Sequence, residues 1–93
     1  MSVYVIVHAT PKNPEKMQAY GALAGPTLAA YGGKLVTRGP SEALAGEHQH
    51  KLLVLLEFPD KDAARRWYGS PEYQAAIPTR LEAMDSVFVL GGE

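Results

Sequence analysis

The sequence contains no cysteine, and that absence excludes disulfide bonds, thiolate nucleophiles and zinc–thiolate sites. It also has no apolar run near the roughly 20 residues that a membrane-spanning helix needs. An excess of charge of one sign is missing as well, because nine basic residues face ten acidic ones and leave a net charge of −1. This balance argues against a nucleic-acid-binding surface or a polybasic membrane patch. We therefore expect no nucleic-acid partner and no membrane partner.

Several functional motifs are absent too. The first residues, Met1–Tyr4, carry no basic charge of the kind that opens a secretory signal peptide, so we expect a cytoplasmic location. Neither a Gly-x-Gly-x-x-Gly pattern nor a Walker sequence is present to hold a phosphate, and no serine lies in a nucleophile elbow. We expect no cofactor.

The chain is also short. Its 93 residues, 46% of them apolar, fit a single domain that spans residues 1–93. Ordering a chain of this length costs on the order of 140 kcal/mol, at roughly 1.5 kcal/mol per residue. Little core is left to offset that cost, so we expect a second subunit to contribute.

Helix and strand signals alternate along the sequence. Aliphatic and β-branched runs predict strands, and cap–proline–acid sequences at Asn13–Glu15 and Ser70–Glu72 predict helix starts. Pro26 and Pro78 predict a kink or break in the helices that contain them. The predicted elements are strands over 3–7, 35–37, 51–58 and 87–90, helices over 13–31, 60–68 and 70–84, and a loop over 39–50. This β-α-β-β-α-β order predicts an α+β, ferredoxin-like sheet with strand order 4-1-3-2 and its helices on one face.

Alternation along each strand divides the predicted sheet into two faces. The face expected under the helices is aliphatic and comprises Val3, Val5, Val7, Leu35, Thr37, Leu52, Val54, Leu56, Val87 and Val89. The other face mixes apolar and polar residues and comprises Tyr4, Ile6, His8, Lys34, Val36, Arg38, Leu53, Leu55, Glu57, Phe88 and Leu90. Soluble monomers rarely expose an apolar band of this kind, so we expect a homodimer through the sheet faces.

A ligand site is predicted on the second face. If Tyr4 lies opposite Glu57 on the neighbouring strand, Lys34 lies beside Glu57, and His8 and Arg38 flank Leu53. With strands about 4.8 Å apart, the two flanking residues would lie roughly 10 Å from each other, which leaves room for a small organic acid. His8 would act as the general base and Arg38 would hold a carboxylate or enolate.

A series of short motifs follows the same order along the chain: Tyr31-Gly32-Gly33, Arg38-Gly39, Leu56-Glu57-Phe58-Pro59, Trp67-Tyr68, Ser70-Pro71-Glu72-Tyr73-Gln74 and Arg80. In this order and spacing, from the first strand to the last, the motifs resemble the domain of unknown function 1330 family. The resemblance implies a small, mostly bacterial protein of the dimeric α/β-barrel superfamily, in which two ferredoxin-like sheets face each other. The family has no settled activity, so the resemblance implies no catalytic residue. Other branches of the superfamily include cofactor-independent mono-oxygenases, lactone isomerases and haem-handling enzymes, a likeness of fold alone.

Each candidate residue also has a structural interpretation. His8 fits a solvated strand end as well as a general base, and Arg38 fits a salt bridge at the dimer rim as well as an anion site. Glu57 with Lys34 is typical of a cross-strand ion pair, although the two also fit an acid/base pair. Tyr4 could donate to a ligand or be an interface aromatic residue.

The remaining candidates lie on helices and loops. Trp67 and Tyr68 are adjacent on a helix and cannot point the same way, so we expect one in the core and the other at the mouth of a cavity. His48 and His50 lie in an exposed loop that offers no rigid third ligand, so we predict no metal site. Tyr31, Tyr73 and Arg80 are packing and capping candidates.

Two functions are consistent with these residues. One is a cofactor-independent enzyme that carries out proton transfer or oxygenation on an acidic or phenolic compound. The alternative is a non-catalytic ligand-binding or accessory module that uses the same cavity.

Overall fold

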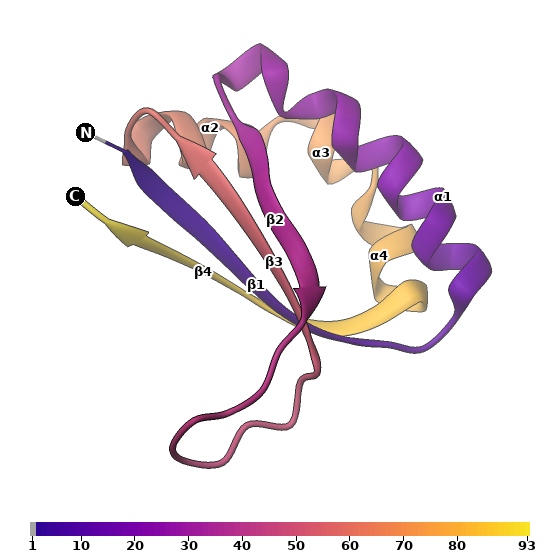
Figure 1. Cartoon of the computed structure of the whole chain (residues 1–93). Helices are drawn as coiled ribbons and strands as arrows, with labels where there is room; N and C mark the ends of the chain where they lie inside the picture. Colours follow the sequence, from indigo (N-terminus) through magenta and orange to yellow (C-terminus); the bar gives the residue numbers. More distant parts are fainter. Residues whose placement is uncertain (1) are drawn as a thin grey trace.

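The structure is a computed structural model that describes residues 2–93 (Figure 1). Four antiparallel strands form one sheet in the order β2-β3-β1-β4, which confirms the predicted ferredoxin-like topology. The elements in chain order are β1 (Val3–Pro11), α1 (Pro14–Ala24), the 3₁₀ turns η1 (Gly25–Thr27) and η2 (Ala29–Tyr31), β2 (Lys34–Pro40), β3 (Leu52–Phe58), α2 (Lys61–Gly69), α3 (Pro71–Gln74), α4 (Ile77–Ala83) and β4 (Met84–Gly92).

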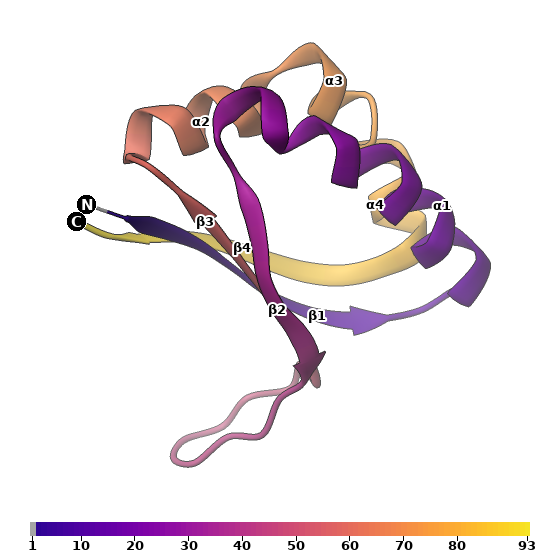
Figure 2. The ribbon, with the colours of Figure 1, turned by 45° about the horizontal axis from the view of Figure 1, so that its top comes forward.

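The helices cover one face of the sheet and leave the other face open (Figure 2). The loop between β2 and β3 projects from one end of the sheet (Figure 1). No helix within residues 2–93 is long and apolar enough to cross a membrane.

The helices begin where the sequence predicts. The side chain of Asn13 accepts a hydrogen bond from the backbone N–H of Lys16 at 3.2 Å, Asp60 accepts from Ala63 at 2.7 Å, and Ser70 caps the next helix. Proline interrupts the helices as expected, because α1 gives way to a 3₁₀ turn at Gly25–Thr27, which contains Pro26, and α4 begins one residue before Pro78.

An aromatic cluster forms the centre of the core between the helices and the sheet. Trp67 of α2 and Tyr73 of α3 are buried, with ring centroids 4.4 Å apart. Phe58 of β3 packs on Trp67 from the sheet side at 5.4 Å. Trp67 is therefore the core member of the predicted Trp67–Tyr68 pair, and Tyr68 is only partly buried.

The assignment of faces in β4 is wrong by one residue. Phe88 and Leu90 pack against the core, whereas Val87 and Val89 are 47% and 45% exposed on the open face. Phe88 pairs with the buried Val7 of β1, and residues paired across a sheet lie on the same face. Because every side chain from Val87 to Leu90 is apolar, alternation alone gives no way to decide which residues point inward.

The assignment of Arg38 is also wrong. Lys34 pairs with Glu57 and Leu35 with Leu56 as predicted, but the register shifts between Leu35 and Thr37. Such a β-bulge places one extra residue in the strand and reverses the side on which the following side chains lie. Arg38 therefore pairs with Val54 and faces the helices, while Thr37 pairs with Leu55 and takes the side predicted for Arg38.

The contact between Gly33 and Phe58 gives a direct test of this packing. A Cβ at Gly33 would lie 2.5 Å from Cε1 of the buried Phe58 ring. We expect Gly33→Ala to lower the free energy of unfolding by about 1–3 kcal/mol, because the core has no room for the methyl group. Gly21→Ala is the matched control: nothing lies within 4 Å of its Cβ position in α1, and the change should stabilise the helix by about 0.5–1 kcal/mol. Urea unfolding measures both, and a Gly33→Ala variant as stable as the parent would contradict the packing.

Candidate ligand-binding site

A cavity of about 320 Å³ lies between α1 and the helix-side face of the sheet. Its walls are mainly apolar and include Met17, Leu28, Val54, Leu56, Trp67 and Phe88. The cavity exists because small residues lie there, namely Gly21 and Ala24 of α1 and Gly25 of η1, which cannot fill the space above β2 and β3. Leu35 of β2 consequently stays 54% exposed although it lies on the helix side. Apolar walls with few polar groups are typical of small-molecule sites.

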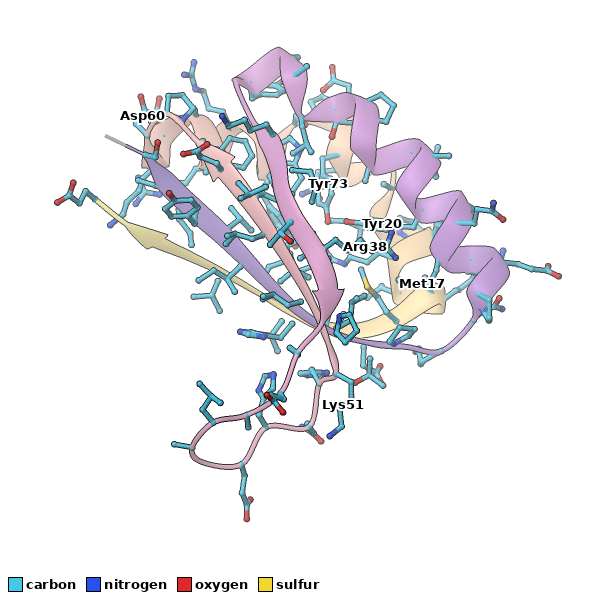
Figure 3. The ribbon with its side chains drawn as sticks, in the orientation of Figure 1. Met17, Tyr20, Arg38, Lys51, Asp60 and Tyr73 are labelled. Atoms are coloured by element: carbon cyan, nitrogen blue, oxygen red, sulfur yellow. The ribbon has the colours of Figure 1, made fainter. Side chains whose placement is uncertain are left out.

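Among the described residues that line this cavity, Arg38 is the one that carries a charge. Its side chain extends from β2 into the space between β2 and α1, next to Tyr20 (Figure 3). Arg38 forms no salt bridge with any residue that the structure describes, and it is exposed at the cavity rim. A planar guanidinium in this position can make two parallel hydrogen bonds to a carboxylate.

A chain of hydrogen bonds runs from the cavity wall into the protein. The hydroxyls of Tyr20 and Tyr73 lie 2.8 Å apart, and Nη1 of Arg80 donates to the Tyr73 hydroxyl at 2.9 Å and to the Tyr68 hydroxyl at 3.1 Å. Burial raises the pKa of the Tyr20 phenol, and the neighbouring Tyr73 raises it further. Tyr20 is therefore a neutral hydrogen-bonding group at physiological pH and not a base.

Trp67, which the sequence makes a candidate ligand-binding residue, lies among the residues that line the cavity. Its indole N–H donates to the hydroxyl of Thr27 at 2.8 Å, and that hydroxyl donates to the backbone carbonyl of Ala24 at 2.6 Å. The polar edge of the indole is thus satisfied inside the protein. The apolar ring of Trp67 is the part that remains to border the cavity.

His8 lies on the opposite face of the sheet from Arg38, so the predicted His8–Arg38 pair does not form. His8 pairs with Leu53 in the predicted register, but the bulge in β2 turns Arg38 to the other side. The loop between β2 and β3 places the ring of His48 at 4.6 Å from that of His8. Within residues 2–93 the buried Nδ1 of His8 has no hydrogen-bond partner, and burial together with His48 and His50 lowers the pKa of His8.

The row of Tyr4, Glu57 and Lys34 occupies the open face as predicted. Tyr4 pairs with Glu57 across β1 and β3, and Nζ of Lys34 lies 3.1 Å from Oε1 of Glu57. Hydrogen bonds from Ser2, and then from Lys34, lower the pKa of the Glu57 carboxyl. An ionised carboxylate held by a lysine matches the structural interpretation of this pair.

The histidines of the loop interact with groups around them. Nδ1 of His50 lies 2.8 Å from the Thr10 hydroxyl, and the rings of His48 and His50 are 5.9 Å apart. Over residues 2–93, no group of three His, Cys, Asp or Glu side chains has an arrangement that could hold a metal ion.

The hydrogen bonds of Tyr20 and Arg80 are not indicated by any motif in the sequence. Arg80 lies between the apolar residues Ile77 and Leu81, and a cation close to a core needs hydrogen-bond acceptors. The phenols of Tyr68 and Tyr73 supply them.

The fold defines a ferredoxin-like α+β protein with a largely apolar cavity under α1. The chain belongs to the family described as "Domain of unknown function (DUF1330)", whose sequence model matches residues 2–92. No curated protein shows a significant match to the sequence.

Solved structures with a similar fold include three of particular use. A protein of unknown function from Rhodopseudomonas palustris is 23% identical, with a TM-score of 0.79 over 99% of this chain and 82% of that chain. SnoaB, a cofactor-independent oxygenase from Streptomyces nogalater, is 16% identical, with a TM-score of 0.72 over 99% of this chain and 92% of its own. A dimeric ferredoxin-like protein of unknown function from Thermobifida fusca is 18% identical, with a TM-score of 0.68 over 100% of this chain and 92% of that chain. At these identities the likeness concerns the fold.

Proposed function

We propose that the chain binds a small, largely apolar organic acid in the cavity between α1 and the sheet, with Arg38 holding the anionic group. The observation that carries this proposal is the guanidinium of Arg38 at the rim of a mainly apolar cavity, with no salt-bridge partner among residues 2–93. A phenyl-sized body fits between Met17, Leu28 and Trp67, and a carboxylate or phenolate at its end meets Arg38.

A cofactor-independent enzyme is the second candidate, and the likeness of fold to the oxygenase SnoaB favours it. A substrate that ionises to a phenolate can itself donate electrons to dioxygen, so the protein would need to bind the anion and keep water away. None of the described residues that line the cavity carries a carboxylate or an imidazole, and the phenol of Tyr20 stays protonated. Ligand binding is therefore better supported than proton transfer by a base of the protein.

Three of the predicted site residues could contact a ligand only if it bound outside the cavity under α1. His8, Tyr4 and Glu57 all lie on the open face, so a catalytic or binding role for them requires a ligand on that face. A catalytic role of His8 stays a prediction, and it concerns a ligand on the open face, not one in the cavity under α1.

The binding proposal predicts a large effect of Arg38→Met. This change keeps the apolar stem and removes the charge, so 2-naphthoate should bind roughly 10–100-fold more weakly, the loss expected when a hydrogen-bonded charge pair disappears. The neutral 2-naphthamide should bind both proteins alike. Isothermal titration calorimetry measures the affinities, and Arg66→Met is the matched control because Arg66 pairs with Asp62 on α2, outside the cavity. Equal affinity of the parent and Arg38→Met for 2-naphthoate would refute the proposal.

We also propose that two copies associate through the open face. Its apolar residues are Ile6, Leu53, Leu55, Val87 and Val89. Moving one such side chain from full exposure into a core stabilises the buried state by roughly 1.5–3 kcal/mol. Two solved neighbours, from Thermobifida fusca and a Jannaschia species, are described as dimeric ferredoxin-like proteins, which supports this arrangement.

This association predicts that Leu55→Lys dissociates the dimer, because each subunit would place an unpaired charge in the contact. Sedimentation at micromolar concentration should give a monomer of 10.1 kDa for this variant and a dimer for the parent. Leu23→Lys is the control, since Leu23 is 50% exposed on α1 and away from the open face. A parent protein that sediments as a monomer contradicts the proposal.

A further inference from the structure

A second depression, the α2–β4 groove, lies on the far side of the aromatic core from Arg38. Its volume is about 570 Å³, and its polar lining comes from Arg65 and Tyr68 of α2, Arg80 of α4 and Ser86 of β4. Phe88 and Leu90 form its apolar floor. Trp67 and Phe88 border both this groove and the α1 cavity, so an aromatic wall separates the two spaces.

The groove is positively charged. Arg65 and Arg80 both line it, and none of the described residues around them in the lining is acidic. Neither arginine takes part in a salt bridge within residues 2–93, whereas the neighbouring Arg66 pairs with Asp62 at 3.2 Å. This concentration of charge is local, because the whole chain has a net charge of −1.

Arg80 is fixed in place as a cation. Its guanidinium carbon lies 4.7 Å from the centroid of the Phe88 ring, and Nη1 donates to the hydroxyls of Tyr68 and Tyr73. Its Nε is buried and lacks an acceptor among the residues that the structure describes. Phenols accept hydrogen bonds but do not neutralise the charge, so a partly buried guanidinium without a carboxylate partner is costly until an anion arrives.

We propose that the α2–β4 groove is a second binding site, which takes an organic anion with an apolar body. The anionic group meets Arg80 and Arg65, with the hydroxyl of Ser86 as a further donor, and the apolar body lies on Phe88 and Leu90. The site does not depend on Arg38 or on the cavity under α1, because its charged residues come from α2 and α4.

Phenyl phosphate is a suitable probe, because it combines a dianion with a flat apolar ring. Isothermal titration calorimetry of the full chain should show phenyl phosphate binding more tightly than inorganic phosphate, which lacks the ring, and than benzyl alcohol, which lacks the charge. Arg65→Met should weaken phenyl phosphate binding about fivefold, as for a partly exposed charge pair, and Arg80→Gln more than tenfold. The affinity of the Arg66→Met variant for phenyl phosphate should lie within twofold of the parent's, since Arg66 follows Arg65 in α2 but does not line the groove.

Unchanged affinity of the Arg65→Met variant for phenyl phosphate would overturn the proposed binding site in the groove. Because Arg65 is exposed, this variant should fold even if Arg80→Gln does not. Absence of phenyl phosphate binding at millimolar concentration overturns it as well. Arg38→Met separates the two sites: normal phenyl phosphate binding by this variant supports an independent groove, and loss of binding places the probe in the α1 cavity and refutes the groove.

Discussion

A single extra residue in β2 determines which face of the sheet carries Arg38. The bulge between Leu35 and Thr37 reverses the alternation and turns Arg38 from the open face toward the helices. The same shift places Gly39 opposite Leu53, where a regular strand would place Arg38, and so removes a charge from the open face. The position of Arg38 at the α1 cavity and the largely apolar open face therefore have one common cause.

The aromatic core is the second organising feature, because it supports both proposed sites. Trp67 and Phe88 present their rings to the α1 cavity on one side and to the α2–β4 groove on the other. Tyr73 is fully buried and links Tyr20 to Arg80 through its hydroxyl. Each cationic group thus lies beside an apolar surface, the combination that recognises an organic anion rather than an inorganic one.

Much of the fold was predictable from the sequence, and the errors have local physical reasons. Cap residues, prolines and strand runs give the element order, and the β1–β3 register with Tyr4 opposite Glu57 is confirmed. The faces of β4 were not predictable, because the run from Val87 to Leu90 is apolar at every position. The bulge in β2 was not predictable either, since no glycine or proline marks it. The one-residue shift in the register of β2 turns Arg38 away from the face that carries His8 and toward the cavity under α1.

The position of the Arg38 side chain is the central claim, and nuclear Overhauser effects in the free protein measure it most directly. The structure predicts effects between the Arg38 side-chain protons and both the Tyr20 ring and the Met17 methyl group, which border the same cavity. It also predicts a cross-strand effect from the Arg38 backbone to Val54. Effects from the Arg38 side chain to the Leu53 side chain instead would mean a regular β2 strand without a bulge, and would contradict the account.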